Sequence, residues 1–177
     1  MSDPRYTYDK VNAVKVIIVS SKGNVLLIKE PDFNEWMPGH WGLPGGKTLV
    51  KESLFDACKR KVKGDLGLEK FDPLGFFRIE ELLMGSRTAM LYHLVAEVAD
   101  EFIPVGEIAD FKWMSLTDIE GMKLEEFTEF FNRELLLSFI KGDRKLIPLN
   151  FIHSEDYYNK EKSDEAYISW RKSGEGK

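Results

Sequence analysis

Apolar and polar residues alternate or recur at fixed spacing over most of the chain, and this pattern predicts strands and helices. Two β-branched, apolar runs flank the turn signal Lys22-Gly-Asn, which favours a β-hairpin. The predicted strands span residues 14–20, 25–29, 74–78, 89–98 and 111–115. Residues 31–47 are so rich in proline, glycine and tryptophan that we expect an ordered loop or a short strand there.

Apolar residues at three- and four-residue spacing predict a helix over residues 53–66. Its apolar stripe consists of Leu54, Ala57, Cys58 and Val62. Gly67 follows where a helix commonly ends in a left-handed residue.

A second amphipathic helix is expected over residues 125–140, after a short helical turn at 116–119 with Thr117 as its N-cap. The core face of this second helix would consist of Phe127, Phe130, Phe131, Leu135 and Phe139. The order of strands and helices predicts an α/β fold in which a mixed sheet lies between helices.

The periodic pattern weakens near residue 141. We therefore expect one domain over residues 1–141 and a C-terminal extension over residues 142–177, which would pack on the same domain or on a subunit contact. Within the extension, residues 148–153 suggest an extended segment and residues 163–170 a short helix.

Composition restricts the cellular setting and the partners. No stretch reaches the roughly 18 uninterrupted apolar residues of a membrane helix, and the first residues lack the layout of a signal peptide. A single cysteine, Cys58, excludes an internal disulfide and fits a reducing compartment. We expect a cytoplasmic protein with no membrane partner. The net charge of −5 argues against nucleic acid but leaves a small phosphorylated ligand open.

Residues 41–68 combine a Gly-Gly pair with charged residues at fixed spacing. Gly45 and Gly46 allow a ligand to approach the backbone closely. Glu52 and Arg60 can form an ion pair if Glu52 belongs to the loop and folds back onto the helix. A carboxylate beside a backbone carbonyl suits Mg²⁺, which takes oxygen ligands together with substrate phosphates.

The same stretch resembles the Nudix box. That pattern is a glycine, five residues, a glutamate, seven residues, Arg-Glu, an apolar residue, any residue, Glu-Glu, any residue, a glycine and an apolar residue. The matching positions are Gly46, Glu52, Arg60, Val62, Gly67 and Leu68. The resemblance extends over residues 11–141. It implies a Nudix-type α/β/α sandwich, a small-molecule nucleotide as ligand, Mg²⁺ as cofactor and, because dimers are common in the family, a homodimer.

The chain departs from the box at the three glutamates with which the family holds magnesium. These positions are Lys61, Gly64 and Asp65 here, so only Asp65 can still ligate a metal. The formal charge of the three positions changes from −3 to 0, which predicts weak or absent magnesium binding. Lys61 also precedes Asp65 by four residues, a spacing at which the two side chains can pair.

One branch of the family, the GDP-mannose mannosyl hydrolases, resembles this chain in lacking acidic residues at the first two of those positions. The resemblance implies a metal site formed by Asp65, a carbonyl of Gly45 and Glu107 from a later loop. Where that branch has a histidine base, this chain has Ala109. The acidic residues that remain as candidates for a base are Glu101 and Asp110.

Two functions remain open. The first is a magnesium-dependent hydrolase of a nucleoside diphosphate linked to another group, such as a sugar, with Glu52, Arg60 and Asp65 as catalytic residues. The alternative is a catalytically inactive module that binds a nucleotide or docks a partner. Lys47 and Lys61 are candidates for binding the substrate phosphates, although Lys61 also suits an inert surface position. Glu52 and Arg60 also have a structural interpretation, as an ion pair that attaches the loop to the helix.

Overall fold

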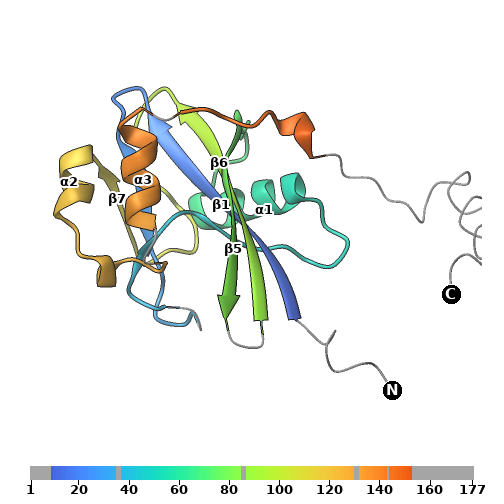
Figure 1. Cartoon of the computed structure of the whole chain (residues 1–177). Helices are drawn as coiled ribbons and strands as arrows, with labels where there is room; N and C mark the ends of the chain where they lie inside the picture. Colours follow the sequence, from blue (N-terminus) through green and yellow to red (C-terminus); the bar gives the residue numbers. More distant parts are fainter. Residues whose placement is uncertain (1–8, 35–36, 85–86, 130–131, 143, 153–177) are drawn as a thin grey trace, which may run out of the picture.

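A mixed β-sheet forms the centre of the computed structural model, which describes residues 9–34, 37–84, 87–129, 132–142 and 144–152 (Figure 1). Within these residues the sheet has seven strands, in the order β3-β2-β1-β6-β5, while β4 pairs with β1 and β7 pairs with β2. The strands are β1 (Asp9–Ser20), β2 (Val25–Lys29), β3 (Trp41–Gly42), β4 (Gly45–Lys47), β5 (Gly75–Met84), β6 (Arg87–Val98) and β7 (Asp110–Met114). Strands β1 and β6 run parallel over their whole length, and the other pairs are antiparallel.

Helices cover both faces of the sheet (Figure 1). The α-helices are α1 (Leu54–Leu66), α2 (Leu116–Gly121) and α3 (Asn132–Ile140). Alternate residues of β1 point to opposite faces: Val16 and Ile18 pack in the core that includes α1, and Ile17 and Val19 pack in the core that includes α2 and α3. The α/β/α sandwich predicted from the sequence is therefore confirmed.

Helix α1 begins and ends where the sequence predicts. The hydroxyl of Ser53 accepts a hydrogen bond from the backbone N–H of Asp56, and Gly67 ends the helix at a φ of 73°. A left-handed residue at this position favours glycine. Cys58 is fully buried on the apolar face of the helix, and burial raises the pKa of its thiol to about 12. Cys58 is therefore an inert core residue.

The segment before α3 is not helical, which corrects the prediction of a helix from residue 125. A 3₁₀ turn, Leu124–Glu126, precedes an extended segment in which Phe127 forms a β-bridge with Trp41. The backbone N–H of Thr128 donates to the carbonyl of Trp41 at 2.8 Å. Pairing with the sheet edge therefore delays the helix until Asn132. The predicted core residues Phe130 and Phe131 lie outside the described residues.

Further boundaries differ from the sequence prediction, among them the start of β1, which is Asp9 and not residue 14. The N-cap of α2 is Ser115, which forms a capping box with Asp118, and not Thr117. Strand β5 continues to Met84, since β6 pairs with it along its length despite its polar residues. Residues 149–151 form a 3₁₀ turn, so the prediction of an extended segment at 148–153 is wrong there.

Part of the C-terminal extension packs on the sandwich. Ile147 exchanges two backbone hydrogen bonds with Phe76 of β5, of 2.7 and 2.9 Å. Leu149 and Ile152 pack against the core on the α1 side. The predicted helix at 163–170 lies outside the described residues. In the described part of the chain, no helix is long and apolar enough to cross a membrane.

Candidate functional site

The candidate site lies where β4 passes into the loop before α1. Gly45 and Gly46 of β4 pair with Lys15 and Val14 of β1. Gly45 has a φ of 145°, and a Cβ atom there would lie 2.1 Å from the carbonyl oxygen of Val14. Only glycine fits this position, because the backbones of the two strands approach so closely.

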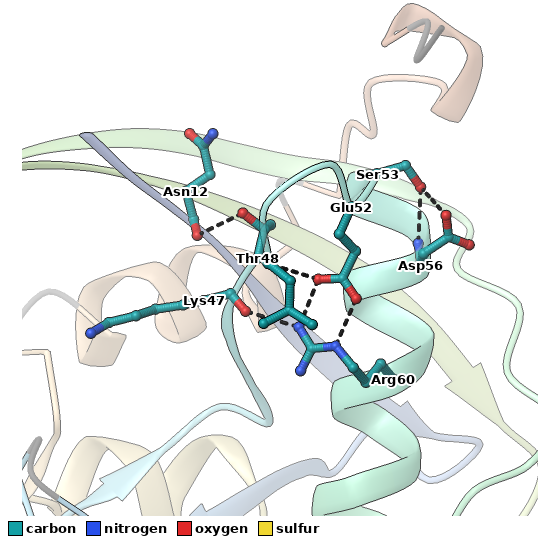
Figure 2. A network of polar contacts seen from close by, with 8 residues as sticks. Asn12, Lys47, Thr48, Glu52, Ser53, Asp56 and Arg60 are labelled. Atoms are coloured by element: carbon teal, nitrogen blue, oxygen red, sulfur yellow. Dashed lines mark hydrogen bonds and ion pairs between the residues drawn. The ribbon is translucent and has the colours of Figure 1, made fainter. Parts of the chain in front are cut away.

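Glu52 and Arg60 attach the loop to α1, as their spacing allows (Figure 2). The guanidinium of Arg60 donates from Nε to Glu52 at 2.6 Å and from Nη2 at 2.7 Å, and it also donates to the carbonyl of Lys47 at 3.0 Å. The Glu52 carboxylate accepts a further hydrogen bond from the N–H of Leu49. The Arg60 hydrogen bond is the main cause that lowers the pKa of Glu52 to about 2. Both carboxylate oxygens of Glu52 are thus engaged in holding the loop.

The same loop is attached at each end. Thr48 donates its backbone N–H to the carbonyl of Asn12 in β1 at 2.9 Å, and Ser53 and Asp56 cap the start of α1. The side chain of Lys47 points away from this network (Figure 2). Lys47 therefore contributes its carbonyl to the loop and leaves its ammonium group exposed.

Asp65 is the buried carboxylate of the site, and both of its oxygens have partners. Oδ2 accepts the backbone N–H of Gly45 at 2.9 Å, and Oδ1 lies 3.2 Å from Nζ of Lys61. Burial raises the pKa of Asp65, while the ammonium of Lys61 and the hydrogen bond from Gly45 oppose that rise. The pairing of Lys61 with Asp65 that the four-residue spacing allows is present.

Glu107, the third metal ligand that the sequence suggests, is exposed. Its backbone N–H donates to the carbonyl of Gly64 at 2.9 Å, so its loop packs on the end of α1. The donors at the site do not fit a magnesium ion, because an ammonium group pairs with Asp65 and Gly64 offers no side chain. Within the described residues, no three histidine, cysteine, aspartate or glutamate side chains are grouped as a metal site.

The two acidic candidates for a base have partners in other parts of the structure. Glu101 accepts a hydrogen bond from Asn24 at 2.8 Å and pairs with Lys22, so it stabilises the turn between β1 and β2. Asp110 accepts from the backbone N–H of Phe111 at the start of β7. Both carboxylates have local structural contacts.

A buried polar cluster on the α3 face of the sheet was not found from the sequence. Lys15 of β1 pairs with Glu129 at 3.2 Å, and Glu129 also accepts hydrogen bonds from Thr128 and Asn132. His93, beside Lys15 on the parallel strand β6, has no exposed surface. A lysine and a histidine inside apolar strands are the signal that could have revealed this cluster.

Solved structures resemble the chain in fold. The MutT protein from Methanosarcina mazei Go1 has a TM-score of 0.66 and 22% sequence identity, over 78% of this chain and 99% of that one. A Nudix hydrolase from Nitrosomonas europaea has a TM-score of 0.67 and 19% identity, over 84% and 99%. The Nudix domain of Shewanella oneidensis NrtR, crystallised in complex with ADP ribose, has a TM-score of 0.56 and 21% identity, over 76% and 88%. Identities this low establish the fold alone.

The sandwich, with a Gly-Gly strand leading through an anchored loop into α1, defines a domain of the Nudix type. The family model described as NUDIX domain matches residues 9–139. The chain therefore belongs to the Nudix family. No curated protein is similar enough to the chain to match it.

Proposed function

We propose that this Nudix domain binds a nucleoside diphosphate linked to another group, and that it does so without magnesium-dependent hydrolysis. The observation that carries this proposal is the pairing of Asp65. One oxygen of its carboxylate is bound to Gly45 and the other faces Lys61. The last carboxylate of the box is therefore occupied by groups of the chain itself.

The framework around the Gly-Gly pair supports binding. The ion pair of Glu52 and Arg60 holds the loop against α1, and a loop ordered in advance loses less conformational entropy when a ligand binds. The Nudix domain of NrtR was crystallised with ADP ribose, a compound of the proposed class. Such a ligand carries a diphosphate between two other groups.

Isothermal titration with ADP-ribose, a nucleotide sugar and a dinucleotide tests the proposal. Binding is expected in EDTA. Excess magnesium should weaken that binding, since Mg²⁺ complexed to the diphosphate neutralises the charge that the protein recognises. Thermal unfolding should shift upward with ligand in EDTA as well.

Product release measured on the same compounds separates this proposal from the hydrolase. Turnover that requires magnesium and disappears in Asp65→Ala would establish the magnesium-dependent hydrolase instead. If the protein binds none of these compounds, with or without magnesium, both the binding function and the magnesium-dependent hydrolase are refuted.

A further inference from the structure

Lys61 lies directly over the backbone of Gly46. A Cβ atom on Gly46 would lie 2.7 Å from Cε of Lys61 and 3.3 Å from its Nζ. Gly46 has a φ of 157°, so its lack of a side chain permits both this backbone conformation and the approach of the lysine. The aliphatic part of Lys61 is thus held in place by the Gly-Gly strand.

The ammonium group of Lys61 is directed at Asp65 without being enclosed. The side chain of Lys61 is 29% exposed, whereas that of Asp65 is 10% exposed. An ammonium carries three N–H donors, and within the described part of the chain its ion pair is with Asp65 alone. Donors therefore remain available on the solvent side of Gly46.

We propose that Lys61 binds a phosphate group of the ligand through its ammonium, above Gly46, and supplies the positive charge that a bound divalent ion would otherwise provide. This inference rests on the proposed function, and it identifies Lys61 as the residue that makes binding independent of metal. Asp65 orients the ammonium through their ion pair. Charged donors on phosphate form the stronger class of hydrogen bond.

Asp65→Asn provides the background in which this role is separated from a structural one. Asparagine can still accept the N–H of Gly45, but it leaves Lys61 with no carboxylate to neutralise. If Lys61 serves only as the partner of Asp65, then replacing Lys61 in the Asp65→Asn protein leaves ligand affinity unchanged. If Lys61 binds phosphate, the same replacement lowers ligand affinity.

The experiment compares Asp65→Asn with Asp65→Asn/Lys61→Met, using inorganic pyrophosphate and ADP-ribose in EDTA. We expect the second variant to bind both probes about tenfold to a hundredfold more weakly, which is the range for one hydrogen bond from a charged donor. Asp65→Asn/Lys61→Arg should recover most of the affinity. The matched control is Asp65→Asn/Lys63→Met, because Lys63 lies on the same helix in an exposed pair with Glu69, and its affinity should equal that of Asp65→Asn.

Equal affinities of the Asp65→Asn and Asp65→Asn/Lys61→Met proteins would overturn the role of Lys61 while leaving the proposed function intact. If the unmodified protein and Asp65→Asn bind neither probe, and the unmodified protein also binds neither the nucleotide sugar nor the dinucleotide, the proposed function fails as well. Circular dichroism and thermal unfolding confirm that each variant is folded before its affinity is compared.

Discussion

Lys15 and Glu129 form an ion pair inside the protein, with Nζ of the lysine 3.2 Å from Oε1 of the glutamate. Each side chain is only 8% exposed. Burial opposes the ionisation of Glu129, but the ammonium of Lys15 and the hydrogen bonds to the carboxylate hold its pKa below the usual value. The pair thereby attaches the segment before α3 to the middle of β1.

Removing Lys15 should leave a buried carboxylate without its counter-charge. We expect Lys15→Met to lower the free energy of unfolding by about 3–5 kcal/mol, the range measured when one partner of a buried pair is removed. Urea denaturation at neutral pH measures the change. Lys15→Met/Glu129→Gln should be more stable than Lys15→Met, because glutamine carries no charge. A change below about 1 kcal/mol in the single variant would show that the pair behaves like an exposed one.

The sequence predicts the sandwich and the Gly-Gly strand because local signals specify them. The stripe from Ala57 to Val62 and the glycine at position 67 define α1 without knowledge of any other element. Lys61 and Asp65 lie on that same helix, so their pairing also follows from spacing. The contacts that the sequence does not predict join distant segments.

The start of α3 shows why such contacts escape prediction. Phe127 fits a helical apolar stripe, yet it pairs with Trp41, far away in the sequence. In the same way, nothing local indicates that Glu129 meets Lys15. Both depend on how the chain folds across the sheet edge, where tertiary pairing overrides helical periodicity.

The carboxylate of Glu52 should contribute stability that depends on pH. Its hydrogen bond from Arg60 lowers its pKa from 4.5 to about 2 in the folded protein. A lowered carboxylate pKa means that the contribution is present above pH 4.5 and is lost as the pH falls toward 2. Glu52→Gln removes this contribution. Urea denaturation between pH 2 and 7 should therefore show two stability curves that converge in acid, and parallel curves would contradict the assignment.

Two substitutions should create a divalent-cation site. A Cβ atom at Gly64 meets nothing within 4 Å, so a glutamate there would extend into open space on the same helix face as residues 61 and 65. Lys61→Glu/Gly64→Glu removes the ammonium and adds two carboxylates beside Asp65. We expect it to bind Mn²⁺, measured by electron paramagnetic resonance. The control Lys61→Gln/Gly64→Gln has side chains of the same size without charge. If this control also binds Mn²⁺, the added carboxylates are not what creates the site.

His93 should make the protein less stable in mild acid. Burial, and next the ammonium of Lys15, lower the pKa of His93 from 6.5 to about 4. The unfolded chain therefore binds a proton between these two pH values that the folded chain does not, so the contribution of His93 is complete above pH 6.5 and declines as the pH falls toward 4. The slope is at most about 1.4 kcal/mol per pH unit for one proton.

The measurement for His93 is the difference in unfolding free energy between the wild-type protein and His93→Gln at each pH. Taking the difference removes the contributions of groups that do not interact with His93. Glu80 does interact, since its carboxylate lies 3.7 Å from Nδ1 of His93 and its pKa is raised by burial, so the same difference is also measured in a Glu80→Gln background. The wild type should lose stability relative to the variant on acidification from pH 6.5 to 4. A constant difference over that range would mean that His93 binds its proton equally well in the folded and unfolded chains, and that its burial is therefore offset by Glu80 or Glu129.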